Sequence, residues 1–253
     1  MSVSKLEVAM RTDQGVVRKN NEDAVGGDLS AGLVILADGM GGANAGEVAS
    51  NLAMDLLVNE LVVSREPAAK DLDHDDLLEA MGRVNHAILD LAQNVPEYHG
   101  MGTTLIMGLY QQDILTYAHV GDSRLYRFRH GVLDALTRDH TLIQELVELG
   151  EFKSLDEAML AGVSQNILTR AFGSEADVQV DIANIKLSAG DLFLFCSDGL
   201  TNMVSETEIQ QILEQESIDL MPQVDALINK ACTNGGADNV SVILVRFIDS
   251  DKS

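Results

Sequence analysis

Four apolar, strand-like runs of this chain border an aspartate. Three runs lead into Asp38, Asp122 and Asp198, and the fourth, NVSVILV, follows Asp238. Strand ends lie at the rim of a packed sheet, where side chains converge to form sites. Several carboxylates cannot all stay ionised a few ångströms apart, because each raises the pKa of its neighbours. These aspartates therefore either point in different directions or surround cations.

The chain is strongly acidic, with 40 acidic and 17 basic residues and a net charge of −23 over 253 residues. It lacks the basic surface that nucleic acid binding requires and the polybasic segment that an anionic membrane attracts. The simplest explanation of the acidity is a solvated surface. A protein of this charge that handled phosphate would need metal ions to reverse the local field.

Length and a hydrophobic content of 46% fit one domain spanning residues 1–253, with a disordered polar tail at 249–253. The N-terminus shows no secretory signal, and no apolar run approaches the roughly 18 residues of a membrane span. Cys196 and Cys232 lack metal-like spacing and are interpreted as buried thiols of a reducing compartment. We therefore expect a cytoplasmic monomer that spans no membrane.

Apolar periodicity predicts strands and helices in separate groups. Strands are expected at residues 5–10, 32–37, 103–110, 114–120, 123–129, 191–196 and 240–247. Helices are expected at 46–63, 75–94, 205–216 and 222–233, with further helices after residue 139. The three strands between 103 and 129 are predicted to form a meander. Because single-helix βαβ units are missing, the pattern favours an α+β fold with antiparallel sheets over a doubly wound parallel sheet.

Each acidic motif has a structural explanation of its own. Asp38 lies in D-G-M-G-G, which is equally a tight glycine-rich turn, and the other three aspartates fit Asx turns or loop tips. Glu22 and Asp23 alone would be an ordinary charged surface pair. Taken together, these oxygen ligands favour a hard cation such as Mg²⁺, Mn²⁺ or Ca²⁺. The histidines lack zinc-site spacing, and His119 is interpreted as a core or hairpin residue.

Six motifs in one order resemble the PPM family of metal-dependent protein serine/threonine phosphatases (type 2C), in its stand-alone bacterial form. They are R-K-N-N-E-D, D-G-M-G-G, M-G-T-T, V-G-D-S-R, S-D-G-L and G-G-A-D-N-V-S, and the resemblance spans about residues 8–247. It implies a four-layer α-β-β-α sandwich, two antiparallel sheets flanked by helix pairs, with the metal site at one end of the sheets. It also implies hydrolysis of phosphoserine and phosphothreonine by a water or hydroxide bridging two Mn²⁺ or Mg²⁺ ions.

The resemblance assigns roles to the matching residues of this chain. Asp38 is expected to bridge the two catalytic ions, with the backbone carbonyl of Gly39 on one of them. Asp198 and Asp238 are expected to complete the coordination of the first ion. Glu22 is expected to hold the second ion directly or through water.

The remaining roles concern residues around these ligands. Asp23 is expected close behind them, and Asp122 with Asp198 matches the weaker third metal site of bacterial members. Arg18 is expected to bind the substrate phosphate, a bidentate task that suits a guanidinium. Residues 141–177 resemble the flap of bacterial members, a helical insertion beside the active site. An ordinary helix pair that covers a sheet edge would give the same sequence pattern. Thr103 and Thr104 could bond the metal carboxylates or simply begin a strand.

One position departs from the family pattern. Many relatives have a histidine, a candidate general acid, where this chain has Ala43 followed by Asn44. We expect reduced dependence on a protein acid, and we expect that Ala43→His would change the acidic limb of the pH–rate profile.

The resemblance implies an enzyme that opposes a bacterial Ser/Thr kinase and acts on phosphorylated proteins. One alternative is a catalytically inactive relative that serves as a binding or scaffold module, but such a protein would be expected to lose metal carboxylates that this chain retains. Another is an acidic Ca²⁺-binding protein, which gives no reason for Arg18 beside Glu22 and Asp23.

Overall fold

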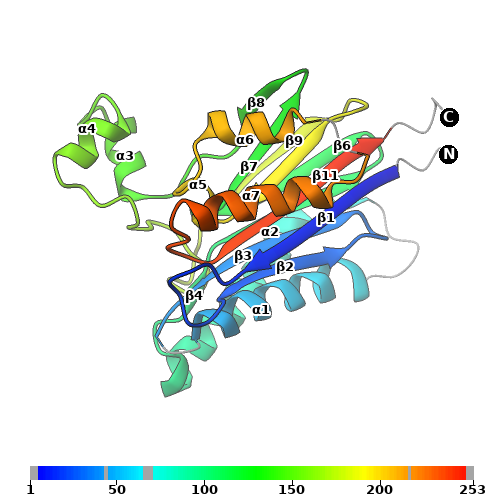
Figure 1. Cartoon of the computed structure of the whole chain (residues 1–253). Coiled ribbons are helices and arrows are strands. Elements are labelled where there is room, and N and C mark those ends of the chain that lie inside the picture. Colours follow the sequence, from blue (N-terminus) through cyan, green and yellow to red (C-terminus); the bar gives the residue numbers. More distant parts are fainter. Residues whose placement is uncertain (1–4, 43–44, 65–70, 216–217, 249–253) are drawn as a thin grey trace.

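Two β-sheets lie face to face, and helices cover both outer faces (Figure 1). The computed structural model describes residues 5–42, 45–64, 71–215 and 218–248. The polar tail at 249–253, expected to be disordered, lies outside the described residues. Both described chain ends are at one end of the sheets, and the loops that hold the acidic motifs are at the other (Figure 1).

The five-stranded sheet has the order β1-β11-β10-β7-β8, with every pair antiparallel. Its strands, in that order, are Lys5–Asp13, Val240–Ile248, Leu192–Cys196, Arg124–Arg129 and Val132–Ala135. The six-stranded sheet has the order β2-β3-β5-β6-β9, also antiparallel, and β4 pairs with β3 off this path. Its strands are Asp23–Asp28, Leu33–Met40, Leu105–Gln111, Ile114–Val120 and Asp181–Lys186, with β4 at Gly102–Thr103.

Two groups of helices cover the sheets. Helices α1 (Ala45–Val58) and α2 (His74–Asn94) lie on the six-stranded sheet; a π-turn, η1 (Asn59–Val63), extends α1, and a short 3-10 turn, η2 (Pro96–Tyr98), follows α2. Helices α5 (Asp198–Thr201), α6 (Glu206–Leu213) and α7 (Met221–Thr233) lie on the five-stranded sheet. A capping box begins α6 at Ser205: the Ser205 side chain accepts from the Glu208 amide, and the Glu208 side chain accepts from the Ser205 amide.

Three separate apolar layers follow from strand alternation. Leu33 and Ile35 of β3 face α1 and α2, whereas Val34 and Leu36 of the same strand face the other sheet. On β10, Phe193 and Phe195 join this inter-sheet layer, while the residues between and beside them face α6 and α7. The layers stack as helices, sheet, sheet and helices, so the expected α-β-β-α sandwich is confirmed.

The expected meander is wrong. Strands β5 and β6 do form a hairpin, but β7 belongs to the other sheet, where it pairs with β10 and β8. The chain crosses between the sheets at Gly121, whose φ of +107° lies in the region that favours glycine. Apolar patterning reports that a strand is buried but not which sheet it joins.

Residues 141–177 leave the sandwich at the end that carries the acidic motifs. They contain α3 (Leu142–Glu148) and α4 (Leu155–Leu160), which project beyond the sheets (Figure 1). The two arms of this flap meet at its base, where Thr141 bridges to Leu168. Next to it, the Leu142 amide bonds the Ile167 carbonyl at 2.8 Å. One β-bridge and one adjacent hydrogen bond thus join the two arms at the base of this projecting segment, for which we keep the name flap.

Candidate metal and phosphate site

Acidic side chains from both sheets meet at one end of the sandwich. Asp23 of β2 and Asp38 of β3 are register partners in the six-stranded sheet. From the five-stranded sheet, Asp198 is the first residue of α5, directly after β10, and Asp238 lies just before β11. Asp38 is not at a strand end as expected, because β3 continues to Met40 and pairs there with β4.

Asp23 is the most enclosed of these carboxylates, with 6% of its surface exposed. Its Oδ2 accepts hydrogen bonds from Ser241 Oγ at 2.6 Å and from Ser197 Oγ at 3.0 Å. Its Oδ1 is buried and has no hydrogen-bond partner. Burial raises the Asp23 pKa to about 7 despite these hydroxyls. An oxygen that is buried and unpaired fits a position close behind bound cations and their water.

The aspartates disfavour one another's ionised form. Burial, then the charge of Asp23, raises the pKa of Asp38 well above its usual range. Burial raises the Asp122 pKa to about 7 and the Asp198 pKa to about 6; the charge of Asp198 adds to the first shift and the charge of Asp238 adds to the second. Asp38 feels the charges of Asp198, Asp122 and Asp238 as well. The aspartates are therefore close enough to repel one another, and bound cations would relieve that repulsion.

Arg18 and Glu22 border the same space. Arg18 Nη2 lies 2.6 Å from Asp238 Oδ2, and the arginine side chain is half exposed. Glu22 is positioned through its amide, which donates to Asn239 Oδ1 at 2.9 Å, and its Oε1 accepts from Asn20 Nδ2 at 2.9 Å. A guanidinium at the open edge of a carboxylate cluster can bind an anion that the cluster alone would repel.

The backbone around Asp38 is fixed by the M-G-T-T motif. Thr104 donates its amide to the Asp38 carbonyl at 2.8 Å and accepts the Asp38 amide at its hydroxyl at 3.1 Å. Thr103 Oγ1 donates to the same carbonyl at 2.9 Å. The threonine hydroxyls thus hold the backbone of Asp38, not its carboxylate. Gly39 is enclosed between Gly46 and the Glu22 carbonyl, with no room for a side chain.

The donor set fits a divalent hard cation. Oxygen atoms from Glu22, Asp38, Asp198 and Asp238 border one space, together with Asp122, and such ligands suit Mg²⁺ and Mn²⁺. The structure does not support a thiol nucleophile, because the reactive form of a thiol is the thiolate. Burial raises the Cys196 pKa to about 12, and the Cys232 pKa is also raised. Cys196 is buried as expected, whereas Cys232 is only partly so.

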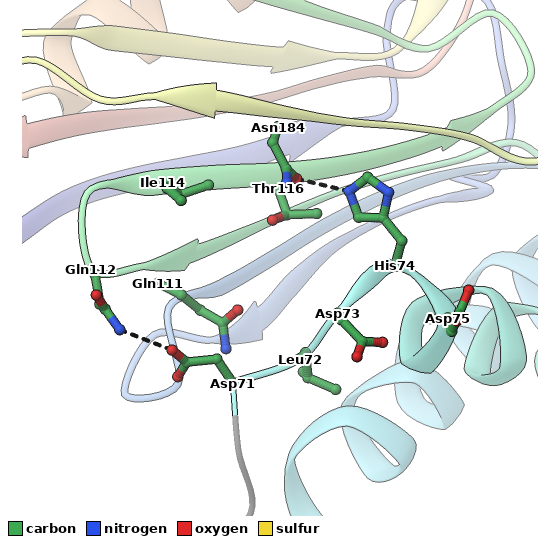
Figure 2. Close-up of a pocket in the computed structure, with 10 residues that line it drawn as sticks. All are labelled: Asp71, Leu72, Asp73, His74, Asp75, Gln111, Gln112, Ile114, Thr116 and Asn184. Atoms are coloured by element: carbon green, nitrogen blue, oxygen red, sulfur yellow. Dashed lines mark hydrogen bonds between the residues drawn. The ribbon is translucent and has the colours of Figure 1, made fainter.

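Two cavities differ in their relation to this site. One, of about 60 Å³, lies between the flap and Asp122, Arg124, Asp139 and Asp198. A larger one, of about 540 Å³, lies at the end of β5 that is farther from the acidic residues, beside the start of α2 (Figure 2). There Asp73 caps α2 by accepting from the Asp76 amide. None of the residues in the acidic motifs lines the larger cavity, so it lies apart from the candidate metal site.

Sequence reasoning missed several polar residues that support the site. Ser197 and Ser241 bind Asp23, and the Asn239 amide donates to the Gln14 and Asn20 carbonyls at 2.9 Å. Asn239 and Ser241 stand in the D-N-V-S motif and Ser197 opens the S-D-G-L motif, so the positions of all three residues were usable signals. Ala43 and Asn44, where the family pattern has a histidine, lie outside the described residues.

Comparisons with known proteins agree with this geometry. A family model described as Protein phosphatase 2C matches residues 16–240. The serine/threonine phosphatase stp of Listeria monocytogenes is 40% identical over 243 residues, which cover 95% of each chain. The crystal structure of the Mycobacterium tuberculosis serine/threonine phosphatase PstP/Ppp has a TM-score of 0.85 at 36% identity and covers 98% of this chain and 100% of that one. The PstP catalytic domain in complex with 2 manganese ions has a TM-score of 0.84 at 36% identity, covering 98% and 100%.

The sandwich with a carboxylate cluster at one end defines the class as metal-dependent phosphatases of proteins. The chain belongs to the protein phosphatase 2C family, the family of protein serine/threonine phosphatases that the ordered motifs indicated. The inferred enzyme class is confirmed, and nothing favours the inactive alternative. Among the described helices, none combines the length and apolar character needed to cross a membrane.

Proposed function

We propose that this enzyme hydrolyses phosphoserine and phosphothreonine in proteins with two Mn²⁺ or Mg²⁺ ions at the carboxylate cluster. The observation that carries the proposal is the shared space in which Asp38, Asp122 and Asp198 all have raised pKa values. Cations relieve this mutual repulsion. The manganese ions of the related PstP domain support the same choice of metal.

Each residue of the cluster has a role in this proposal. Asp38 would be shared by the two ions, with the Gly39 carbonyl, Asp198 and Asp238 on the first ion and Glu22 on the second. Asp122 and Asp198 would hold a weaker third ion. When bound, the ions lower the pKa of water between them and neutralise charge on the phosphoryl group. Everything else in the reaction is positioning by the chain's own side chains.

Arg18 and Asp23 supply that positioning. The Arg18 guanidinium is half exposed beside Asp238, where it can donate two parallel hydrogen bonds to a phosphate. Asp23 keeps Oδ2 occupied by Ser197 and Ser241 and leaves Oδ1 buried without a partner, so this oxygen could accept a hydrogen bond from a water molecule. With a pKa of about 7, Asp23 can also hold a proton at neutral pH.

The test is hydrolysis of a phosphothreonine peptide with Mn²⁺, with EDTA, and by Asp198→Asn. We expect EDTA to abolish activity and Asp198→Asn to lower kcat/KM by about 100-fold or more, because several kcal/mol of transition-state stabilisation depend on the metal. Asp55→Asn, an exposed aspartate of α1, is the matched control and should leave the rate unchanged. Activity that survives EDTA would contradict the two-metal mechanism, and inactive wild-type protein with every divalent metal would favour the scaffold alternative.

We also propose the setting in which the enzyme acts. The whole chain is one phosphatase domain with a flap at 141–177, acting as a cytoplasmic monomer that reverses signalling by a bacterial Ser/Thr kinase. Its two cysteines are free thiols, which fits a reducing compartment. Loss of this protein should raise phosphothreonine levels in its host only while the kinase is present, and gel filtration should give the mass of one chain.

A further inference from the structure

Two histidines and an aspartate form a cluster behind Asp122. His119 is the last residue but one of β6, His140 directly precedes the flap, and Asp181 begins β9. One ligand atom of each lies within 4.8 Å of the others. The histidine rings lie against each other with centroids 4.3 Å apart and planes tilted by 35°. His119 and His140 are buried, with 1% and 5% of their surfaces exposed. This grouping is, at first sight, a further metal site.

The hydrogen bonds assign another role to the cluster. The Gly121 amide donates to His140 Nδ1 at 3.1 Å, so this nitrogen carries no proton. The proton of the neutral ring is then on Nε2, which donates to Asp181 Oδ2 at 3.2 Å. Arg170 Nη1 also lies 3.2 Å from Nε2, but with both nitrogens protonated this contact is no hydrogen bond, and Arg170 donates to Asp181 Oδ1 instead. A protonated Nε2 has no lone pair for a metal. Burial lowers the His140 pKa, which agrees with a neutral ring.

The two histidines form hydrogen bonds with the backbone amide and carbonyl of Gly121. The Gly121 carbonyl accepts from His119 Nε2 at 3.1 Å and from the His140 amide at 2.9 Å. On its other side Gly121 packs against Thr104, so closely that a Cβ at position 121 would lie 2.6 Å from the Thr104 side chain. Asp122 is the next residue. Its carboxylate therefore extends from a backbone segment that two histidines and a threonine hold in place.

The same cluster fastens both arms of the flap. His140 lies on the outgoing arm, and its carbonyl accepts the amide of Thr169 on the returning arm at 2.9 Å. Arg170 of the returning arm donates to Asp181 Oδ1 at 3.1 Å. A movement of the flap base would thus move His140, and through Nδ1 it would move Gly121.

We propose that His140 is a positioning residue that couples the flap base to Asp122. By accepting the Gly121 amide at Nδ1, it sets the place of the Asp122 carboxylate and with it the affinity of the weaker cation position formed by Asp122 and Asp198. The inference rests on the proposed function, which places a cation there. It assigns no direct contact with substrate to His140.

Two substitutions separate the two faces of the ring. In His140→Asn the amide oxygen lies near the former Nδ1 and can still accept from Gly121. In His140→Gln the longer side chain reaches toward Asp181 and leaves the Gly121 amide without an acceptor. Loss of one neutral hydrogen bond corresponds to a change of about three- to tenfold in an equilibrium constant. The two variants differ by one methylene group and are matched controls for each other.

The first readout is Mn²⁺ binding by calorimetry to wild type, both His140 variants, Asp122→Ala and the double variant His140→Gln with Asp122→Ala. We expect His140→Gln to weaken only the binding class that Asp122→Ala removes, by about three- to tenfold, and His140→Asn to retain it. In the Asp122→Ala background, His140→Gln should have no further effect on the remaining class. Equal losses in the two His140 variants, or unchanged Mn²⁺ affinity in a destabilised His140→Gln, would overturn the proposal.

The second readout is NMR of the metal-free protein, which does not depend on the proposed function. The His140 ring should show a protonated Nε2 and a bare Nδ1, and the Gly121 and Asp122 amide resonances should shift in His140→Gln more than in His140→Asn. A proton on Nδ1 would overturn the positioning role. Wild-type protein with these NMR signatures that binds no Mn²⁺ would instead contradict the proposed function and the metal-affinity part of the inference, leaving the coupling of His140 to Gly121 intact.

Discussion

The Arg18 guanidinium and the Asp238 carboxylate form a 2.6 Å ion pair although 220 positions separate them in the chain. The pair places the candidate phosphate ligand directly on a candidate metal ligand. A cation bound by Asp238 would compete with Arg18 for that carboxylate, and the guanidinium would then be released toward the substrate. Phosphate binding and metal binding are in this way linked through one side chain.

Replacing Arg18 should weaken substrate binding. Arg18→Ala is expected to raise the KM for a phosphothreonine peptide by about 10- to 100-fold, because a hydrogen bond between charged groups contributes about 1.5–3 kcal/mol. Arg18→Lys should give a smaller increase, since it keeps the charge but loses the planar fork. Arg11→Ala is the control: Arg11 is similarly exposed and pairs with Asp225 at 2.8 Å on another part of the surface. An unchanged KM in Arg18→Ala would exclude this role.

Asp23→Asn should stabilise the metal-free fold at high pH while lowering activity. The folded pKa of Asp23 is about 7, above its ordinary value of 3.8, so its contribution to stability is present below 3.8 and is lost as the pH rises through 7. An asparagine avoids that loss. In EDTA, thermal unfolding should therefore show the variant more stable than wild type at pH 8 and no more stable at pH 4. A less stable variant at pH 8 would show that the buried charge is compensated in the metal-free protein.

Stabilisation by Mn²⁺ should increase with pH. In the metal-free fold, protons stay on Asp122 up to a pKa of about 7 and on Asp198 up to about 6, and a cation must displace them. The increase in Tm on adding Mn²⁺ should therefore be larger at pH 7.5 than at pH 5.5. Calorimetry in buffers of different ionisation enthalpy should show proton release on binding. Asp38→Asn serves as the control, because it removes a shared ligand and should flatten the pH dependence.

Gly39→Ala should destabilise the fold, and Gly42→Ala should not. A Cβ at Gly39 would lie 2.6 Å from the Glu22 carbonyl oxygen and still closer to that of Gly46. Separating these segments is expected to cost about 1–3 kcal/mol and to weaken Mn²⁺ binding, because Glu22 and Asp38 would move apart. A Cβ at Gly42 meets no heavy atom within 4 Å. Urea unfolding of the two variants measures the difference, and equal stabilities would contradict the close packing at Gly39.

The sequence predicted the strands that carry a clear apolar pattern and missed those that do not. Strand β10, which ends at Cys196, is a continuous apolar run and was recognised, whereas β2, with the sequence DAVGGD, has no such pattern and is held by its pairing with β3. Strand β9, with the sequence DIANIK, was missed for the same reason, since none of its residues is fully buried. Local propensity cannot detect a strand whose stability comes from its neighbours.

The site was predictable where chemistry requires a particular residue type in a recognisable motif. Arg18, Glu22 and the aspartates therefore came from the motifs, and the structure brings them together. His140 was not recognised, because it acts on the backbone of Gly121 and such a contact leaves no pattern in the chain. Its role depends on β6 and the flap base lying side by side, which only the fold establishes.

The inter-sheet layer has a consequence beyond stability. Asp23 and Asp38 belong to one sheet, while Asp198, Asp238 and the serines that bind Asp23 lie in or next to strands β10 and β11 of the other. Gly108 and Phe195 meet between the sheets so closely that a side chain at Gly108 would begin 2.6 Å from the phenyl ring. The thickness of this apolar layer therefore determines how far apart the two halves of the cation cage stand. A methyl group added in the middle of the sandwich is therefore expected to change the spacing of the cation ligands at its rim.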